Sequence, residues 1–132
     1  MAEKQFKLEI ISPDRSFYSG AATMLEYRTT EGEVGIYADH VPMTQIVAPG
    51  IMTITEADGE QKKAALMSGF VEILPEKITI LAETVEWPEE IDKNRAQAAK
   101  ERAEDRLRSG GGSIDTARAE LALKRALIRL SF

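Results

Sequence analysis

The sequence predicts an α+β fold in which an N-terminal antiparallel β-sandwich, residues 1–87, is followed by a C-terminal antiparallel two-helix hairpin, residues 88–132. Two observations predict this division. Short apolar segments with period-two or β-branched patterns, separated by turn signals, fill the first part. From residue 91 the apolar period changes to about 3.6 residues, which is typical of amphipathic helices.

The strand-like segments of the first part alternate with turns rich in Pro, Gly and Asp. These segments read FKLEII, MLEYRTT, GIMTITEADG, AALMSGFVEIL and KITILAETV. The turn signals lie at residues 13–14, 31–33, 49–50, 58–59 and 74–76. Many short strands at this spacing favour a sandwich or barrel, which is stabilised by two inward faces that pack on each other.

Two helices are predicted after the Trp87-Pro88 dipeptide, because a proline disfavours helical conformation in the residue before it. Asp92 is the candidate N-cap of a helix that reaches about residue 108. Asp115 is the candidate N-cap of a second helix that reaches about residue 130. The segment SGGGS, residues 109–113, separates them, and so short a loop favours an antiparallel hairpin.

Composition excludes several classes of protein. The chain has 132 residues, of which 43% are hydrophobic and 30% charged, so it has enough apolar residues for a globular core. A net charge of −5 argues against non-specific binding to nucleic acid. The absence of cysteine excludes disulfides and thiol catalysis and suggests a reducing compartment. No apolar run approaches the ~18 residues of a membrane span, so membrane association would need a partner.

The two predicted helices carry an internal repeat with an offset of 23 residues. IDKNRAQAAKERAEDRL, residues 91–107, and IDTARAELALKRALIRL, residues 114–130, match at nine of seventeen positions. At 100° per residue, the three arginines of each copy fall within ~40° of one another on one helix face. The equivalent pairs are Arg95/Arg118, Arg102/Arg125 and Arg106/Arg129.

Each arginine row borders a strip of mostly small residues, which would let the helices approach closely. The strips are Ala96, Ala99, Ala103 and Leu107, and Ala119, Ala122, Ala126 and Leu130. Six guanidinium groups beside one seam repel one another, and arginine does not deprotonate in proteins. Carboxylates or an external anion must therefore neutralise them, and guanidinium groups bind phosphate oxygens well.

Two other interpretations of the arginines stay open. Arginines beside alanines on a helix are commonly surface residues with i,i+4 partners, each pair contributing a few tenths of a kcal/mol. In the second interpretation, the arginines dock the hairpin on an acidic protein surface. The segment SGGGS is not a P-loop, because it lacks the Lys-Ser/Thr ending and follows no strand. His40, as the single histidine, does not predict a metal site, and no catalytic residue is predicted.

Three segments are similar to the epsilon subunit of bacterial, bacillus-type, rotary ATP synthase. They read TTEGEVGIYADHVPMTQIVAPG (29–50), SGFVEILPEKITILAE (68–83) and IDTARAELALKRALIRLS (114–131). The resemblance covers nearly the whole chain in order. It implies a β-sandwich followed by two helices, and a non-catalytic regulatory subunit of the rotor stalk. The implied location is peripheral, on the cytoplasmic side of the cell membrane.

The resemblance also implies partners. The sandwich is expected to contact the gamma subunit and the ring of c subunits, so that the chain meets the membrane only through the complex. The helical domain is expected to permit ATP hydrolysis when compact. Extended toward the alpha/beta hexamer, it is expected to inhibit hydrolysis.

The resemblance further implies that ATP binds the compact hairpin as a regulatory ligand. The family motif Ile/Leu-Asp-x-x-Arg-Ala falls on Ile91, Asp92, Arg95 and Ala96. Arg106 belongs to the arginine row but not to the implied contacts. The presence of Mg²⁺ with the nucleotide stays open. The remaining implied ATP contacts are Glu86, Arg102, Arg118, Arg125 and Arg129.

Two functions of other classes remain as alternatives. The first is a free-standing ATP-binding sensor without a motor partner, and the second is an enzyme. A large exposed apolar surface on the sandwich would favour the partner-bound subunit, since lone soluble proteins rarely expose one. Turnover of ATP by the isolated chain would favour the enzyme.

Overall fold

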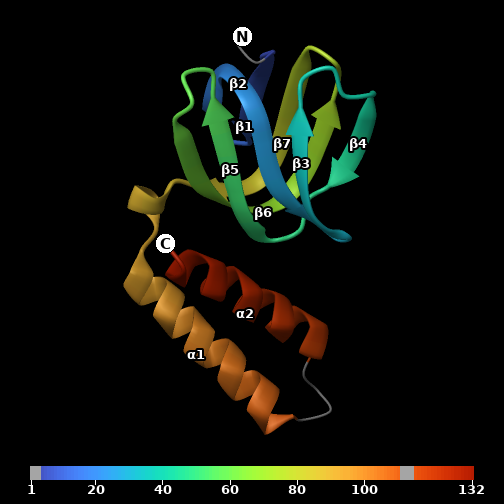
Figure 1. Cartoon of the computed structure of the whole chain (residues 1–132). Helices are drawn as coiled ribbons and strands as arrows, with labels where there is room; N and C mark the ends of the chain where they lie inside the picture. The colour runs from blue at the N-terminus through green and yellow to red at the C-terminus, as the bar shows by residue number, and fades with distance from the viewer. Residues whose placement is uncertain (1–3, 111–114) are drawn as a thin grey trace. The chain divides into compact units, whose positions relative to one another are not determined.

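The computed structural model describes residues 4–110 and 115–132, and its contacts divide the chain into two compact units, Met1–Trp87 and Pro88–Phe132. Strands form the first unit and helices the second (Figure 1). The β-sandwich followed by two helices is therefore confirmed. Of the predicted SGGGS break, residues 111–113 lie outside the described residues.

The strands of the first unit form a sheet that closes on itself. Hydrogen bonding runs in the order β1–β7–β6–β5–β2 and returns from β2 to β1, while β3 joins β2 and β4 joins β6. The strands β3 and β4 are not part of this closed ring and extend it as edge strands. The ring is flattened, so that it forms two facing layers. The bounds are β1 (Phe6–Ser12), β2 (Arg15–Thr29), β3 (Gly32–Tyr37), β4 (Met43–Ile46), β5 (Gly50–Glu56), β6 (Gln61–Ile73) and β7 (Lys77–Glu86).

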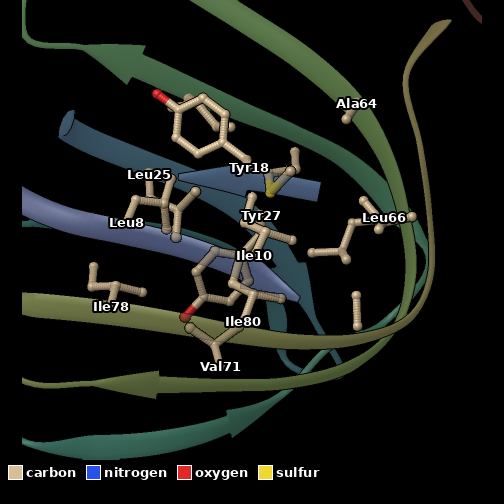
Figure 2. Close-up of a cluster of buried hydrophobic side chains, with 14 of the residues drawn as sticks. Leu8, Ile10, Tyr18, Leu25, Tyr27, Ala64, Leu66, Val71, Ile78 and Ile80 are labelled. Carbon is tan, nitrogen blue, oxygen red and sulfur yellow. The ribbon is translucent and has the colours of Figure 1, made fainter. Parts of the chain in front are cut away.

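Alternation along the strands fills the space between the layers with apolar side chains. In β1 every second residue is buried, so that Leu8 and Ile10 point inward beside their β7 partners Ile78 and Ile80. Figure 2 shows these side chains gathered with residues of β2 and β6. Aliphatic packing of this kind supplies most of the stability of a small sandwich.

One pairing departs from the predicted antiparallel arrangement. β1 and β7 run parallel, with Leu8 opposite Ile78, whereas the other ladders are antiparallel. The two strands are joined through nearly the whole unit rather than by a hairpin. A parallel pair needs a long connection, and no local turn signal marks it in the sequence.

The helical unit holds α1 (Lys93–Ser109) and α2 (Thr116–Leu130), preceded by a short 3₁₀ helix, η1 (Pro88–Glu90), that was not predicted. Both predicted N-caps are confirmed. Asp92 Oδ1 accepts from the Arg95 backbone N–H at 3.0 Å, and Asp115 Oδ1 from the Arg118 N–H at 3.1 Å. α1 ends at Gly110, whose φ of 53° is the left-handed conformation that glycine adopts without strain.

α1 and α2 are antiparallel, as predicted (Figure 1). Lys93 Nζ, at the start of α1, donates to the backbone oxygens of Leu130 (3.4 Å) and Phe132, at the end of α2. A lysine at this place also complements the negative end of the α2 dipole. Among the described residues, no helix is long and apolar enough to cross a membrane.

Trp87, the last residue of the first unit, packs on the sandwich. Its ring stacks on Phe17 with 4.2 Å between centroids and meets Tyr18 edge-on at 6.4 Å. The described ring contacts hold it within the first unit, directly before Pro88.

Candidate functional site

The repeat and the antiparallel pairing together place both arginine rows on one side of the hairpin. The buried alanines Ala96 and Ala103 of α1 are equivalent, at an offset of 23, to the buried alanines Ala119 and Ala126 of α2. Equivalent residues therefore form the seam in both helices. Two antiparallel helices that meet through equivalent residues are related by a pseudo-two-fold axis perpendicular to their common plane.

Rotation about that axis maps the arginine row of one helix onto the row of the other helix, so both rows lie on the same side of the hairpin. We call the resulting surface the arginine face. It holds three arginines from each helix, which lie about 100° around each helix from the buried alanines at positions 96 and 119. Its members are Arg95, Arg102 and Arg106 of α1, and Arg118, Arg125 and Arg129 of α2.

Burial differs along the face. Arg95, Arg102, Arg106 and Arg118 are exposed, while Arg125 and Arg129 are half-buried. In addition, Nε of Arg125 is buried without a hydrogen-bond partner. An orphaned buried donor costs about 1–3 kcal/mol, more if it belongs to a charged group.

The surface-pair interpretation of the arginines requires carboxylate partners. Apart from Arg129, no guanidinium of the arginine face has a carboxylate within 4.0 Å among residues 4–110 and 115–132. The α1 carboxylates point elsewhere: Asp105 pairs with Arg108 at 2.5 Å, and Glu101 accepts from Gln97 at 3.2 Å. Five guanidinium groups thus remain available to an external anion.

The residues of the predicted ATP site are divided between the two units. Glu86 ends β7 in the first unit, whereas the other eight residues belong to the second. Ile91 and Ala96 are buried, so both act as packing residues. Asp92 uses one carboxylate oxygen as the α1 cap and presents the other to solvent or to a ligand. Within the second unit, Asp92, Arg95 and Arg129 share the end of the hairpin that Lys93 closes.

A second candidate site lies on the sandwich and was missed by residue-level prediction. Four exposed apolar side chains form one cross-strand row on the outer face of β4, β6, β7 and β1: Ile46 pairs with Phe70, Phe70 with Leu81, and Leu81 with Ile11. Their exposed fractions are 59%, 49%, 50% and 40% in that order. We call this set the apolar row.

Neighbours of the apolar row in sequence, such as Val71 and Ile80, point into the core. At the level of the row, β6, β7 and β1 therefore carry apolar residues on both faces, which solvent-facing strands rarely do. The adjacent apolar residues are visible in the sequence as FV within SGFVEIL and ILA within KITILAE. The register that aligns the four outer residues is not visible in the sequence.

Two family models together match almost the whole chain. Residues 5–88 match the family described as "ATP synthase, Delta/Epsilon chain, beta-sandwich domain", and residues 89–132 match "ATP synthase, Delta/Epsilon chain, long alpha-helix domain". The two matches coincide closely with the two units of the structure.

Individual relatives agree with the family models. The ATP synthase epsilon chain of Caldanaerobacter subterraneus subsp. tengcongensis is 45% identical over 128 residues, which is 97% of this chain and 93% of the relative. The epsilon chains of Shouchella clausii and Bacillus velezensis are 44% and 42% identical. They cover 94% and 96% of this chain, and 91% and 96% of their own length.

Solved structures extend the similarity to assembled complexes. A chain in the cryo-EM structure of Euglena gracilis mitochondrial ATP synthase, OSCP/F1/c-ring, superimposes with a TM-score of 0.82 at 25% identity, over 93% of this chain and 78% of that one. A chain in the Tetrahymena thermophila mitochondrial ATP synthase central stalk/c-ring gives 0.57 at 14% identity, over 99% and 95%. The second similarity supports the fold alone.

Proposed function

The chain belongs to the ATP synthase delta/epsilon family as an epsilon subunit, and we propose that its helical hairpin is an ATP-responsive, non-catalytic regulator of that complex. The family places the chain in the central stalk of a rotary ATP synthase. The proposed regulatory role belongs to the helical unit, and the proposed contacts with other subunits belong to the sandwich.

In the proposed site, the phosphates of ATP lie on the arginine face, and the adenosine end lies near Asp92 and Arg95. The buried Ile91 and Ala96 shape the helix start. Glu86, at the end of β7, is the remaining residue that the family resemblance implies. The guanidinium groups that meet the phosphates are those of Arg102, Arg118, Arg125 and Arg129. Arginine forks match phosphate oxygens in geometry and give charge-assisted hydrogen bonds.

One observation supports this proposal above the others: five of the six guanidinium groups of the arginine face lack a neighbouring counter-charge among the described residues. Five of its guanidinium groups have no carboxylate within 4.0 Å among the described residues, and Nε of Arg125 is buried without a partner. Without a ligand, like charges repel and a donor is unsatisfied, so the compact hairpin is destabilised. A bound triphosphate removes both penalties.

Regulation follows from this difference in stability. ATP that binds only the compact form stabilises it by RT ln(1 + [L]/Kd), about 2.7 kcal/mol when ATP exceeds Kd a hundredfold. That free energy changes the ratio of two conformers by about a hundredfold. At low ATP the helices separate and extend toward the alpha/beta hexamer, where they inhibit hydrolysis.

The apolar row supports a partner-bound subunit rather than a free-standing sensor. Water-exposed Ile46, Phe70 and Leu81 in direct register form a surface that a partner would bury. We assign the gamma subunit and the c-subunit ring as the sandwich's partners. The chain then lies peripherally on the cytoplasmic side of the cell membrane and contacts the membrane through the complex.

Hydrolysis by the assembled complex tests the regulatory role. The rate is measured from micromolar to millimolar ATP, with and without Mg²⁺ in excess of nucleotide, for complexes with the full chain or with residues 88–132 deleted. We expect the deletion to raise hydrolysis at low ATP and to change it little at high ATP. Equal rates for both complexes at every concentration would contradict the proposal.

A further inference from the structure

The motif that carries the proposed adenosine end occurs twice in the hairpin. Ile-Asp-x-x-Arg-Ala begins at residue 91 and again at residue 114. In the described part of both copies the aspartate caps its helix by accepting from the arginine N–H, at 3.0 Å and 3.1 Å. The alanine that follows is 3% exposed in one copy and 2% in the other. The described part of the second copy, from Asp115, therefore folds as the equivalent part of the first does.

The pseudo-two-fold axis gives the arginine face two equivalent ends. One end holds Arg95, from the start of α1, and Arg129, from the end of α2. The other holds Arg118, from the start of α2, and Arg106, from the end of α1. Arg106 is the equivalent of Arg129 at the offset of 23, although it is not among the proposed ATP contacts.

A mononucleotide has one nucleoside, so its nucleoside can occupy only one of the two equivalent ends. A triphosphate brings about four negative charges, at one to two per phosphate, against six guanidinium groups. The row from Arg95 to Arg106 is ~16 Å long, since eleven residues of helix rise 1.5 Å each. A ligand with one nucleoside end places phosphates, but no nucleoside, at the second aspartate-arginine corner, Asp115 and Arg118.

We propose that the arginine face also binds dinucleoside polyphosphates, with one nucleoside at each helix start, the phosphate chain across the seam, and Arg106 as a phosphate-binding residue. This inference rests on the proposed function, because it assigns a second ligand class to the same site. The ligand shares the symmetry of the site: two nucleosides meet two aspartate-arginine corners, and four or more phosphates meet the guanidinium groups between them.

Departures from exact symmetry show which end of the arginine face should bind a ligand less tightly. Arg125 is half-buried, whereas its equivalent Arg102 is exposed, so the α2 arginine is the more desolvated of the pair. Lys93, which reaches the end of α2, has Thr116 as its equivalent. The Arg106 and Arg118 end is therefore the more solvated and lacks the lysine contact. The nucleoside of a mononucleotide prefers the first end, and only a two-ended ligand places a nucleoside at both.

Calorimetric titration of the full chain tests the inference. The ligands are ATP, diadenosine tetraphosphate and inorganic tetraphosphate, and the variants are Arg106→Met and the matched control Arg108→Met. Arg108 lies on the same helix, is also exposed, and pairs with Asp105 away from the arginine face.

We expect the dinucleotide to bind at least about tenfold more tightly than ATP, since charge-assisted hydrogen bonds to a second end each contribute a factor of this size. Arg106→Met should remove that advantage and change ATP affinity by less than about threefold. Arg108→Met should change neither affinity. Circular dichroism at 222 nm checks that both variants stay helical.

Three outcomes would overturn the inference. The dinucleotide binds no more tightly than ATP, or inorganic tetraphosphate shows the same gain, or Arg106→Met weakens ATP and the dinucleotide equally. The proposed function fails separately, when ATP itself does not bind at millimolar concentration. ATP binding without a dinucleotide advantage leaves the proposed function standing and refutes the two-ended site.

Discussion

Replacing Arg125 by methionine should have two opposite effects on the hairpin. Methionine keeps an unbranched apolar side chain of similar reach but removes the charge and the buried Nε that lacks a partner. Removing an orphaned donor recovers about 1 kcal/mol, the lower end of its cost, because the rest of the guanidinium is partly solvated. The unliganded hairpin should therefore become more stable.

The same substitution should weaken ATP binding. Hydrogen bonds to a charged group contribute about 1.5–3 kcal/mol, so the Kd for ATP should rise by about tenfold to a hundredfold. The two effects are read separately. Circular dichroism at 222 nm follows thermal unfolding of the helices, and calorimetry gives the Kd.

Two features of the chain supply controls for this experiment. Trp87 is the single tryptophan and stacks on Phe17, so its fluorescence follows the sandwich, whose unfolding should stay unchanged. Arg108→Met, which breaks an exposed ion pair away from the face, should alter helix stability by less than about 0.5 kcal/mol and leave ATP affinity intact. A destabilised unliganded hairpin, or an unchanged Kd, in Arg125→Met would refute the reasoning.

Three further predictions concern other parts of the chain. Lys93→Met should destabilise the compact hairpin by about 0.3–1 kcal/mol with or without ATP, because it removes a cation from the C-terminus of α2; helix hydrogen exchange measures this. Phe70→Asn should leave sandwich unfolding within about 0.5 kcal/mol but reduce capture of the gamma subunit, whereas Val41→Asn, 68% exposed and outside the apolar row, should not. Burial raises the pKa of Tyr27 to about 12, so stability present below its unfolded pKa of about 10 should be lost as pH rises through 12, and Tyr27→Phe should lack this loss.

Local signals allowed the helical unit to be predicted closely. An aspartate before each periodic segment marked both helix starts, and the structure uses Asp92 and Asp115 as caps. Repeated alanines marked the seam, because mostly small residues recur there at helical spacing. In the second arginine row, Arg125 and Arg129 are half-buried, whereas Arg118 is exposed because it lies in the first turn of α2.

Long-range features of the sandwich were less predictable. The parallel β1–β7 ladder joins strands about seventy residues apart, and nothing in either strand encodes its partner. The short strand β4 (Met43–Ile46) has no buried residue and thus no alternation to reveal it. β2 extends from Arg15 to Thr29, further toward the N-terminus than the predicted segment.

Of the two candidate sites, one was predictable from local sequence and the other was not. The arginine face followed from periodicity and the repeat, since both are properties of one continuous segment. The apolar row did not, because Phe70 and Leu81 become neighbours only through sheet register. The unsatisfied Nε of Arg125 is likewise a property of packing rather than of spacing.

Amide hydrogen exchange of the full chain during an ATP titration tests the central claim most directly. The claim is that a polyphosphate on the arginine face stabilises the compact hairpin. We predict that protection of residues 93–109 and 116–130 rises together as ATP increases, toward about 2.7 kcal/mol at a hundredfold excess over Kd, while protection of β1 to β7 stays constant. Helix exchange that does not change at millimolar ATP would contradict the account.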